Sequence, residues 1–176
     1  MLKINNPIVL VGIMGAGKTS FGKKIAKNMN IPFFDSDHVI EKQEGMSVSN
    51  IFKEYGEEYF RNREYEVIKE LMEINKICVI ALGGGAFVND KIRNLVKNHA
   101  ISVWIKADID VLLRRVSGNN KRPLLENGDK REILLNLLQE RNVYYSQTDI
   151  EILNNDIPYK KVEKVFLNEL EEYYGK

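Results

Sequence analysis

Short apolar runs alternate with longer amphipathic stretches along most of this chain. Five of the apolar runs are short enough to be strands: Ile8–Val11, Pro32–Phe34, Ile77–Ala81, Ile101–Ile105 and, with a weaker pattern, Ile150–Leu153. Strands that are buried in a parallel sheet read as continuous hydrophobic runs rather than as alternating ones. The runs therefore predict a five-stranded parallel sheet.

The stretches between these runs repeat their apolar residues every three or four positions, which is the period of an amphipathic helix. Three predicted helical faces consist of Phe21, Ile25 and Met29; of Ile109, Leu112, Leu113 and Val116; and of Val162, Val165, Phe166, Leu170 and Tyr173. The alternation of strands and helices is typical of βαβ units. We therefore expect an α/β fold with helices on both faces of the sheet and ligands outside the carboxyl ends of the strands.

Length, charge and cysteine content narrow the class of protein. A chain of 176 residues predicts a single domain, and a net charge of 26 − 25 = +1 gives no strong field to attract nucleic acid or an anionic membrane. The longest apolar stretch, Ile77–Leu82, is far shorter than the ~20 residues of a membrane span, and Met1–Asn6 lacks the apolar region of a secretory signal. Cys78 is the only cysteine and is expected to pack in the core, which fits a reducing compartment. We expect a cytoplasmic protein.

A phosphate-binding motif directly follows the first predicted strand. The segment Gly12–Thr19 reads G-I-M-G-A-G-K-T, which fits G-x-x-x-x-G-K-[ST] without deviation. Glycines let backbone N–H groups turn inward around phosphate oxygens, Lys18 supplies a charge to the β- and γ-phosphates, and Thr19 supplies a hydroxyl to Mg²⁺. A helix beginning at Lys18 adds the positive end of its dipole. The alternative is a strand-to-helix turn without a ligand, but the complete motif favours a nucleotide site.

The phosphate-binding motif does not identify the group that receives the phosphate. Many NTPases hold Mg²⁺ with an acid at the end of another strand, but the third predicted strand ends in Gly83-Gly84-Gly85. The missing carboxylate is expected from Asp35 or Asp37, which follow the second predicted strand. Two carboxylates one residue apart leave a strand end on different sides, so one can face the metal and the other a second substrate. The alternative is that Asp37 caps a helix over 38–43.

The order and spacing of six motifs resemble the shikimate kinase family. The motifs are G-x-M-G-A-G-K-T at Gly12–Thr19, F-x-D-S-D at Phe33–Asp37, G-E-x-x-F-R at Gly56–Arg61, G-G-G at Gly83–Gly85, R-P-L-L at Arg122–Leu125 and E-R-x-x-x-Y at Glu140–Tyr145. The resemblance extends from about Ile8 to Glu169. It implies a monomeric P-loop kinase of the nucleoside-monophosphate-kinase structural class, which transfers the γ-phosphate of ATP to the 3-hydroxyl of shikimate on the route to chorismate and the aromatic amino acids.

The resemblance also implies roles for individual residues. The ATP-binding residues would be Gly15, Ala16, Gly17, Lys18, Thr19 and Ser20, with Arg115 against the adenine and Arg122 reaching the phosphates from a lid. Thr19 and Asp35 would hold Mg²⁺, Asp35 through water. The shikimate-binding residues would be Asp37, Arg61, Gly84 and Arg141. Lys18, Asp37 and Arg122 would act in catalysis.

Residue patterns support these roles independently. Shikimate carries one carboxylate and three hydroxyls, and an arginine fork matches a carboxylate with two parallel hydrogen bonds. Arg61 and Arg141 lie on predicted apolar helix faces, where an unpaired charge is costly; the first face contains Tyr65, Ile68 and Met72, and the second contains Leu134, Leu137, Leu138 and Tyr145. The alternatives are structural ion pairs, such as Glu57 with Arg61, or arginine stems that extend to solvent.

Two further features leave alternatives open. Gly83–Gly85 is either a flexible turn or a place where backbone amides approach a small ligand closely. The segment Arg114–Arg131 has a local charge of 6 − 2 = +4, and its polar centre, 117–128, is either a mobile lid over the phosphates or a solvated basic loop. Rival functions are a gluconate or nucleoside-monophosphate kinase, and a nucleotide-binding regulatory module without acceptor chemistry. The paired aspartates and the two arginines argue against the regulatory module.

Overall fold

The computed structural model describes residues 4–74, 76–117 and 128–175. In chain order, the elements of this part are β1 (Ile8–Val11), α1 (Lys18–Met29), β2 (Phe33–Asp35), α2 (Ser36–Glu44), α3 (Val48–Ile74), β3 (Val79–Ala81), the 3₁₀ helix η1 (Ala86–Val88), α4 (Asp90–His99), β4 (Ile101–Lys106), α5 (Ile109–Ser117), α6 (Lys130–Tyr145), β5 (Ile150–Leu153) and α7 (Tyr159–Tyr174). None of the helices within these ranges is both long enough and apolar enough to cross a membrane.

The five strands form one parallel sheet in the order β2-β3-β1-β4-β5. The prediction of a five-stranded parallel sheet is confirmed. The predicted bounds of β1 and β5 agree with the structure, whereas β2 begins and ends one residue later than predicted, at Phe33 and Asp35. β3 is shorter than its apolar run, because the pairing with β1 and β2 begins at Val79; Ile77 is 40% exposed, whereas Cys78 is buried.

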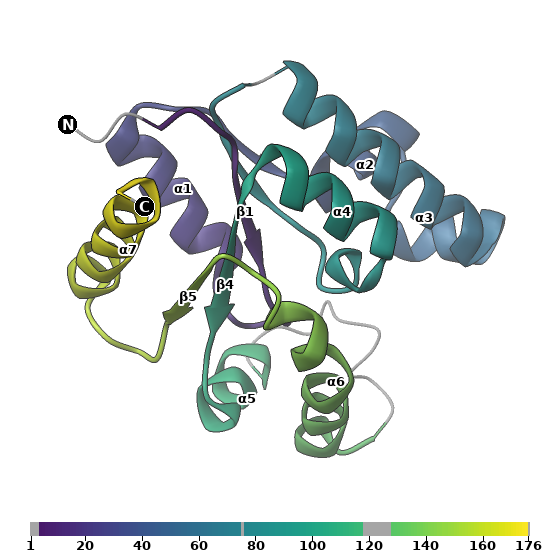
Figure 1. The fold of residues 1–176 in the computed structure, drawn as a ribbon. Helices are drawn as coiled ribbons and strands as arrows, with labels where there is room; N and C mark the ends of the chain where they lie inside the picture. The colour runs from purple at the N-terminus through teal and green to yellow at the C-terminus, as the bar shows by residue number, and fades with distance from the viewer. Residues whose placement is uncertain (1–3, 75, 118–127, 176) are drawn as a thin grey trace.

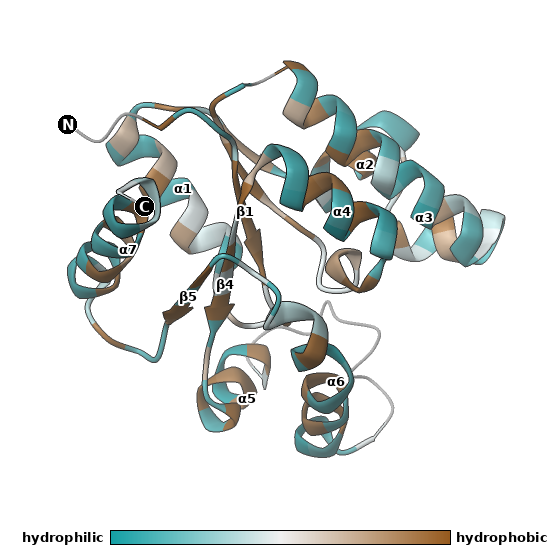
Figure 2. Cartoon of the chain, in the orientation of Figure 1, coloured by the Kyte–Doolittle hydropathy of each residue, from teal (hydrophilic) through white to brown (hydrophobic). Residues whose placement is uncertain are grey.

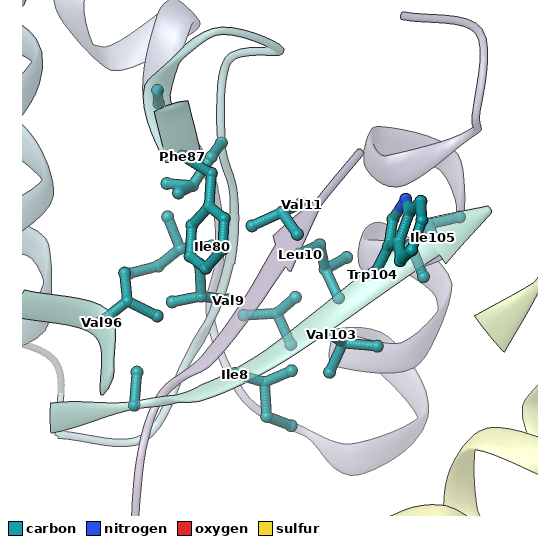
Figure 3. Packing of buried hydrophobic residues seen from close by; sticks show 14 of the residues in the cluster. Ile8, Val9, Leu10, Val11, Ile80, Phe87, Val96, Val103, Trp104 and Ile105 are labelled. Atoms are coloured by element: carbon teal, nitrogen blue, oxygen red, sulfur yellow. The ribbon is translucent and has the colours of Figure 1, made fainter. Parts of the chain in front are cut away.

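Helices lie on both sides of the sheet, as predicted. In Figure 1, α1 and α7 lie to one side of the strands, and α2, α3 and α4 lie to the other. The strands are the most uniformly hydrophobic part of the chain in Figure 2. Figure 3 shows residues of β1, β3 and β4 in the buried cluster that also contains Phe87 and Val96. All four residues of β1 are buried, because this strand has neighbours on both edges and helices on both faces. Cys78 is buried in the core, as predicted.

The predicted helical faces are correct for α1 and α5 and partly wrong for α7. In α7, Val162, Phe166 and Leu170 are buried, but Val165 is 48% exposed and Tyr173 is 38% exposed. The buried residues recur every four positions, so they form a narrow stripe toward the core, and the other two lie on its flank. The sequence pattern overestimated the width of this face.

A break in α3 sets the direction of the helix that carries Arg61. Gly56 interrupts the helical backbone with φ 83° and ψ 174°, a conformation that glycine adopts without the strain that a side chain causes. The segment after the break buries Phe60, Val67 and Ile68 against the core. This packing fixes the face of α3 on which Arg61 lies.

Candidate active site

The predicted site residues meet at the carboxyl ends of the central strands. β1 leads into the phosphate loop at Gly12, β2 ends at Asp35, and β3 leads into Gly83–Gly85. Because β1 and β3 are paired neighbours and β3 also pairs with β2, these three strand ends lie together. The sheet order thus places the acidic strand end beside the phosphate loop, although a whole helix separates them in sequence.

The phosphate loop has the backbone that its motif predicts. Gly15 and Gly17 have φ values of 82° and 95°, in the left-handed region that favours glycine, and α1 begins at Lys18 as predicted. The Lys18 ammonium donates to the carbonyl oxygens of Gly12 and Ile13 at 2.7 and 3.2 Å. Its charge therefore lies over the loop, where the helix dipole also favours an anion.

Thr19 and Asp35 form a pair of oxygen ligands beside the loop. The Thr19 hydroxyl donates to Asp35 Oδ2 at 2.8 Å. Asp35 Oδ1 accepts from the backbone N–H of His38 at 3.5 Å, so Asp35 and not Asp37 is the N-cap of α2. The alternative assignment of Asp37 as the cap is therefore wrong.

This pair fits a magnesium ion. Mg²⁺ prefers hard oxygen ligands and is usually bound by one or two protein groups, with waters and substrate phosphates completing its octahedron. No group of three or more His, Cys, Asp or Glu side chains that could hold a metal alone occurs within the described ranges. A carboxylate and a hydroxyl next to a phosphate loop are the ligand set expected for a nucleotide-bound Mg²⁺ rather than for a resident metal.

Each glycine of Gly83–Gly85 lies against one of the predicted acceptor-binding side chains. A Cβ on Gly83 would lie 2.5 Å from Asp37 Oδ1, one on Gly84 would lie 3.3 Å from Arg141 Nη1, and one on Gly85 would lie 2.9 Å from Arg61 Nη2. The Gly84 position is also 3.8 Å from the backbone nitrogen of Met14 in the phosphate loop. The glycine turn therefore lies against three charged side chains and close to the phosphate loop, and a Cβ on Gly83 or Gly85 would force its neighbour to move.

Asp37 is the one acid among these three side chains, and its environment raises its pKa. Its Oδ1 is a buried side-chain atom without a hydrogen-bond partner among the described residues. Burial and, to a smaller extent, the Asp35 carboxylate raise the pKa of Asp37 to about 6, while Lys18 and Arg61 counteract part of that rise. A buried, unpartnered carboxylate oxygen is costly, so its presence indicates a place prepared for a hydrogen-bond donor.

Arg61 lies on the apolar face of α3 and is held by two glutamates. Its Nη1 donates to Glu64 at 2.7 Å, and its Nε lies 3.4 Å from Glu57. The structural ion pair that the sequence left open is therefore present, together with a fully buried partner, Glu64, that the sequence analysis did not identify. Burial raises the pKa of Glu64 to about 7, although Arg61 favours its ionised form. The sequence feature that could have identified Glu64 is its i,i+3 spacing from Arg61, which places both residues on the helix face that contains Ile68.

Arg141 approaches the same turn from α6. The hydroxyl of Tyr145, four residues along this helix, donates to the carbonyl oxygen of Gly84. Tyr145 is buried against Trp104, so it fixes the end of α6 to both the sheet and the glycine turn. Arg61, Gly84 and Arg141 are thus brought together as predicted. Arg122 and the centre of the predicted lid, 118–127, lie outside the described residues, so the lid arginine stays a prediction.

Comparison with known proteins gives the family. A family model described as "Shikimate kinase" matches residues 14–171. The chain belongs to the shikimate kinase family. A shikimate kinase of Mesorhizobium japonicum is 41% identical over 168 residues, which cover 96% of this chain and 82% of that protein. A solved structure described as shikimate kinase from Acinetobacter baumannii in complex with shikimate matches with a TM-score of 0.87 and 33% identity, covering 95% of this chain and 94% of that one.

A more distant likeness bears on one of the rival functions. A gluconokinase from Sinorhizobium meliloti matches with a TM-score of 0.64 but only 16% identity. At that identity the likeness shows the shared fold alone. It gives no support to gluconate as the acceptor, whereas the shikimate kinase family is shown by identity along nearly the whole chain.

In this member of the shikimate kinase family, a second group of polar residues surrounds the outer side of the phosphate loop. Arg115 donates to the carbonyl oxygens of Gly15 and Ala16 at 3.2 and 3.4 Å, and to Asn154 O and Asp156 Oδ1 at 2.9 Å each. An open cavity of about 400 Å³ lies here, and its lining includes Ser20, Lys24, Arg115, Asn154, Asp156 and Tyr159. The family resemblance implies that Arg115 lies against the adenine, and this stays a prediction. Asn154 and Asp156 were not predicted, and their only signal in the sequence is their position after a predicted strand.

Proposed function

We propose that this chain transfers the γ-phosphate of ATP to the 3-hydroxyl of shikimate, giving shikimate 3-phosphate and ADP. The observation that carries the proposal is the position of Asp37. Its partnerless Oδ1 lies against Gly83, and its pKa responds to both Lys18 of the phosphate loop and Arg61 of the acceptor side. A carboxylate that is influenced by both cations can accept a hydrogen bond from a hydroxyl that points toward the γ-phosphate.

Arg61 and Arg141 are proposed to bind the carboxylate of shikimate. Both guanidinium groups lie against the glycine turn, within 3.4 Å of the space that a Cβ on Gly85 or Gly84 would take. Guanidinium groups pair with carboxylates through two parallel hydrogen bonds, and this fixes the orientation of the ring that carries the carboxylate. Gly84 has no side chain, so it lets shikimate approach the backbone of the turn closely. The three hydroxyls of the ring would then face Asp37 and the phosphate loop.

The phosphate loop is proposed to hold the triphosphate of ATP. Gly15, Ala16 and Gly17 supply backbone N–H groups, Lys18 supplies charge, and Ser20 lines the outer cavity, as Arg115 does. Thr19 and Asp35 would hold Mg²⁺, which neutralises charge on the β- and γ-phosphates when it is bound. Arg122 is proposed to reach the same phosphates from the lid.

Catalysis by this arrangement would depend mainly on position and charge. Phosphoryl transfer needs an in-line hydroxyl and stabilisation of charge on the moving group. Asp37 orients the hydroxyl and accepts its proton once the carboxylate is ionised, which its raised pKa allows above about pH 6. Monomeric action and a cytoplasmic location stay predictions.

A coupled assay for ADP release tests the proposal. ATP, Mg²⁺ and shikimate should give rapid ADP release, and gluconate or AMP in place of shikimate should give none above background. If ATP and Mg²⁺ give ADP with gluconate or AMP but not with shikimate, the protein is one of the rival kinases. A lack of acceptor-stimulated release with every hydroxy acid would favour a nucleotide-binding regulatory module.

Substitution of the arginines tests the acceptor site. Arg61→Ala or Arg141→Ala should raise the shikimate KM by roughly 10-fold or more, since a hydrogen bond between charged groups contributes about 1.5–3 kcal/mol. The ATP KM should stay within about twofold. Arg63→Ala is the matched control, because Arg61 and Arg63 are both 28% exposed and both pair with glutamates, but Arg63 pairs with Glu44 and Glu66 instead of Glu57 and Glu64. Equal increases in both KM values would contradict the carboxylate assignment.

A further inference from the structure

The phosphate loop is held from outside by a side chain that the proposed mechanism does not use. Asn154, the first residue after β5, donates from Nδ2 to the carbonyl oxygen of Ala16 at 2.7 Å. The two residues are 138 positions apart in sequence. The backbone of Asn154 is itself fixed, because its N–H donates to Lys106 O at 2.8 Å and its carbonyl oxygen accepts from Arg115 at 2.9 Å. A rigid strand end therefore holds the donor in place.

The hydrogen bond to Ala16 controls the orientation of one peptide plane. In a trans peptide, the carbonyl oxygen and the following N–H point in opposite directions. Because Asn154 binds the Ala16 carbonyl from the outer side, the N–H of Gly17 is turned to the opposite side, toward the inside of the loop. The contact is tight, since a Cβ on Gly17 would lie 2.6 Å from Asn154 Nδ2. Arg115 reaches the same carbonyl oxygen only at 3.4 Å, so Asn154 is the closer of the two.

An amide is the appropriate group at this position. Its NH₂ donates to the carbonyl oxygen without adding a charge, whereas a carboxylate of the same size has no proton to donate. A carboxylate would also face the Ala16 oxygen and add a negative charge beside the triphosphate. These consequences distinguish a positioning role from simple packing, because Asn and Asp fill nearly the same volume.

We propose that Asn154 is a positioning residue for phosphate binding. It acts through the Ala16–Gly17 peptide, keeps the Gly17 N–H directed at the phosphates, and has no contact with the reacting atoms. The loop thus binds the nucleotide with its donors already oriented, which reduces the cost of ordering on binding. This inference rests on the proposed function, since it requires the loop to bind ATP.

The test compares Asn154→Ala and Asn154→Asp with Asn155→Ala. Asn155 is a matched control because it is the next residue and is also partly buried, but its side chain binds the backbone N–H and Oδ2 of Asp108 instead of the phosphate loop. Titration calorimetry gives the affinity for Mg·ADP, steady-state kinetics give the two KM values, and inhibition by inorganic tripolyphosphate reports phosphate binding without a base. Thermal unfolding of each variant checks that it is folded.

Asn154→Ala should weaken Mg·ADP and tripolyphosphate by the same factor, ~3- to 10-fold, the effect of losing one neutral hydrogen bond. Asn154→Asp should weaken both further, and the shikimate KM should not change. Asn155→Ala should keep both affinities within about twofold of the wild type even if its melting temperature falls. The proposal is overturned if Asn154→Ala binds Mg·ADP like the wild type, if only Mg·ADP and not tripolyphosphate is weakened, or if Asn155→Ala has the same effect. A wild-type protein that does not bind Mg·ADP would overturn the proposed function itself.

Discussion

Replacement of Asp37 by Asn is expected to stabilise the ligand-free protein while it removes activity. Asp37 has a buried carboxylate oxygen without a hydrogen-bond partner in the described part of the chain, and its environment raises its pKa from the ordinary value of 3.8 to about 6. Burial is the largest cause, followed by the negative charge of Asp35. At pH 8 this rise corresponds to roughly 3 kcal/mol against the ionised folded state. Asn has a similar shape without that charge.

The pH dependence follows from proton binding. Between about pH 4 and pH 6 the folded protein binds more protons at Asp37 than the unfolded chain does, so the wild type loses stability as the pH rises through this window. The variant does not have this loss. Its advantage in the free energy of unfolding should therefore be small near pH 4, about half developed at pH 5 and at most about 3 kcal/mol at pH 8. For a chain of 176 residues, the full effect corresponds to a rise in Tm of roughly 5–10 °C.

Thermal unfolding followed by circular dichroism tests this expectation, with EDTA present and without nucleotide or shikimate. Glu44→Gln serves as a control of opposite sign, because hydrogen bonds from Arg63 and Tyr59 lower the pKa of Glu44. That variant should lose stability at pH 8 and approach the wild type as the pH falls. If Asp37→Asn is no more stable than the wild type at pH 8, or gains the same amount at pH 5 and pH 8, Asp37 is not a destabilised carboxylate.

Three further predictions concern the acceptor side and the core. Gly85→Ala places a Cβ 2.9 Å from Arg61 Nη2 and should raise the shikimate KM several-fold in the coupled assay without changing the ATP KM; a change in the ATP KM alone would contradict it. Within the described residues, Glu64→Gln leaves Arg61 with the exposed Glu57 as its one ionic partner and should raise the shikimate KM by ~10-fold, whereas tighter binding would show that Glu64 competes with the substrate. Cys78, whose pKa burial raises to about 12, should react with iodoacetamide at pH 8 only after unfolding in urea, as measured by mass spectrometry.

Most of the sheet could be predicted because buried parallel strands have a simple sequence signature. The four residues of β1 are apolar and all buried, and their run ends where the phosphate loop begins. The apolar pattern does not predict burial correctly where an element is covered on one side only. Val165 and Tyr173 fit the helical period of α7 but are exposed, since only a narrow stripe of that helix meets the core. Ile77 is apolar but lies outside β3, whose pairing with β1 begins at Val79.

Most of the site residues that could be predicted belong to motifs. Asp37, Arg61, Gly84 and Arg141 were identified from motifs, and the structure brings them together around one glycine turn. Glu64 and Asn154 belong to no motif. Their roles depend on which face of a helix is buried and on which strand end lies beside the phosphate loop, and the sequence alone does not determine either. Asp35 was predicted near the metal, but its second role as the cap of α2 became apparent only from the backbone geometry.

A crystal structure with shikimate and Mg·ADP tests the central claim most directly. The shikimate carboxylate should lie against the guanidinium groups of Arg61 and Arg141, and one ring hydroxyl should lie within hydrogen-bond distance of Asp37 Oδ1. The diphosphate should lie in the loop Gly12–Thr19. Shikimate bound elsewhere, or bound with its carboxylate directed away from both arginines, would contradict the account.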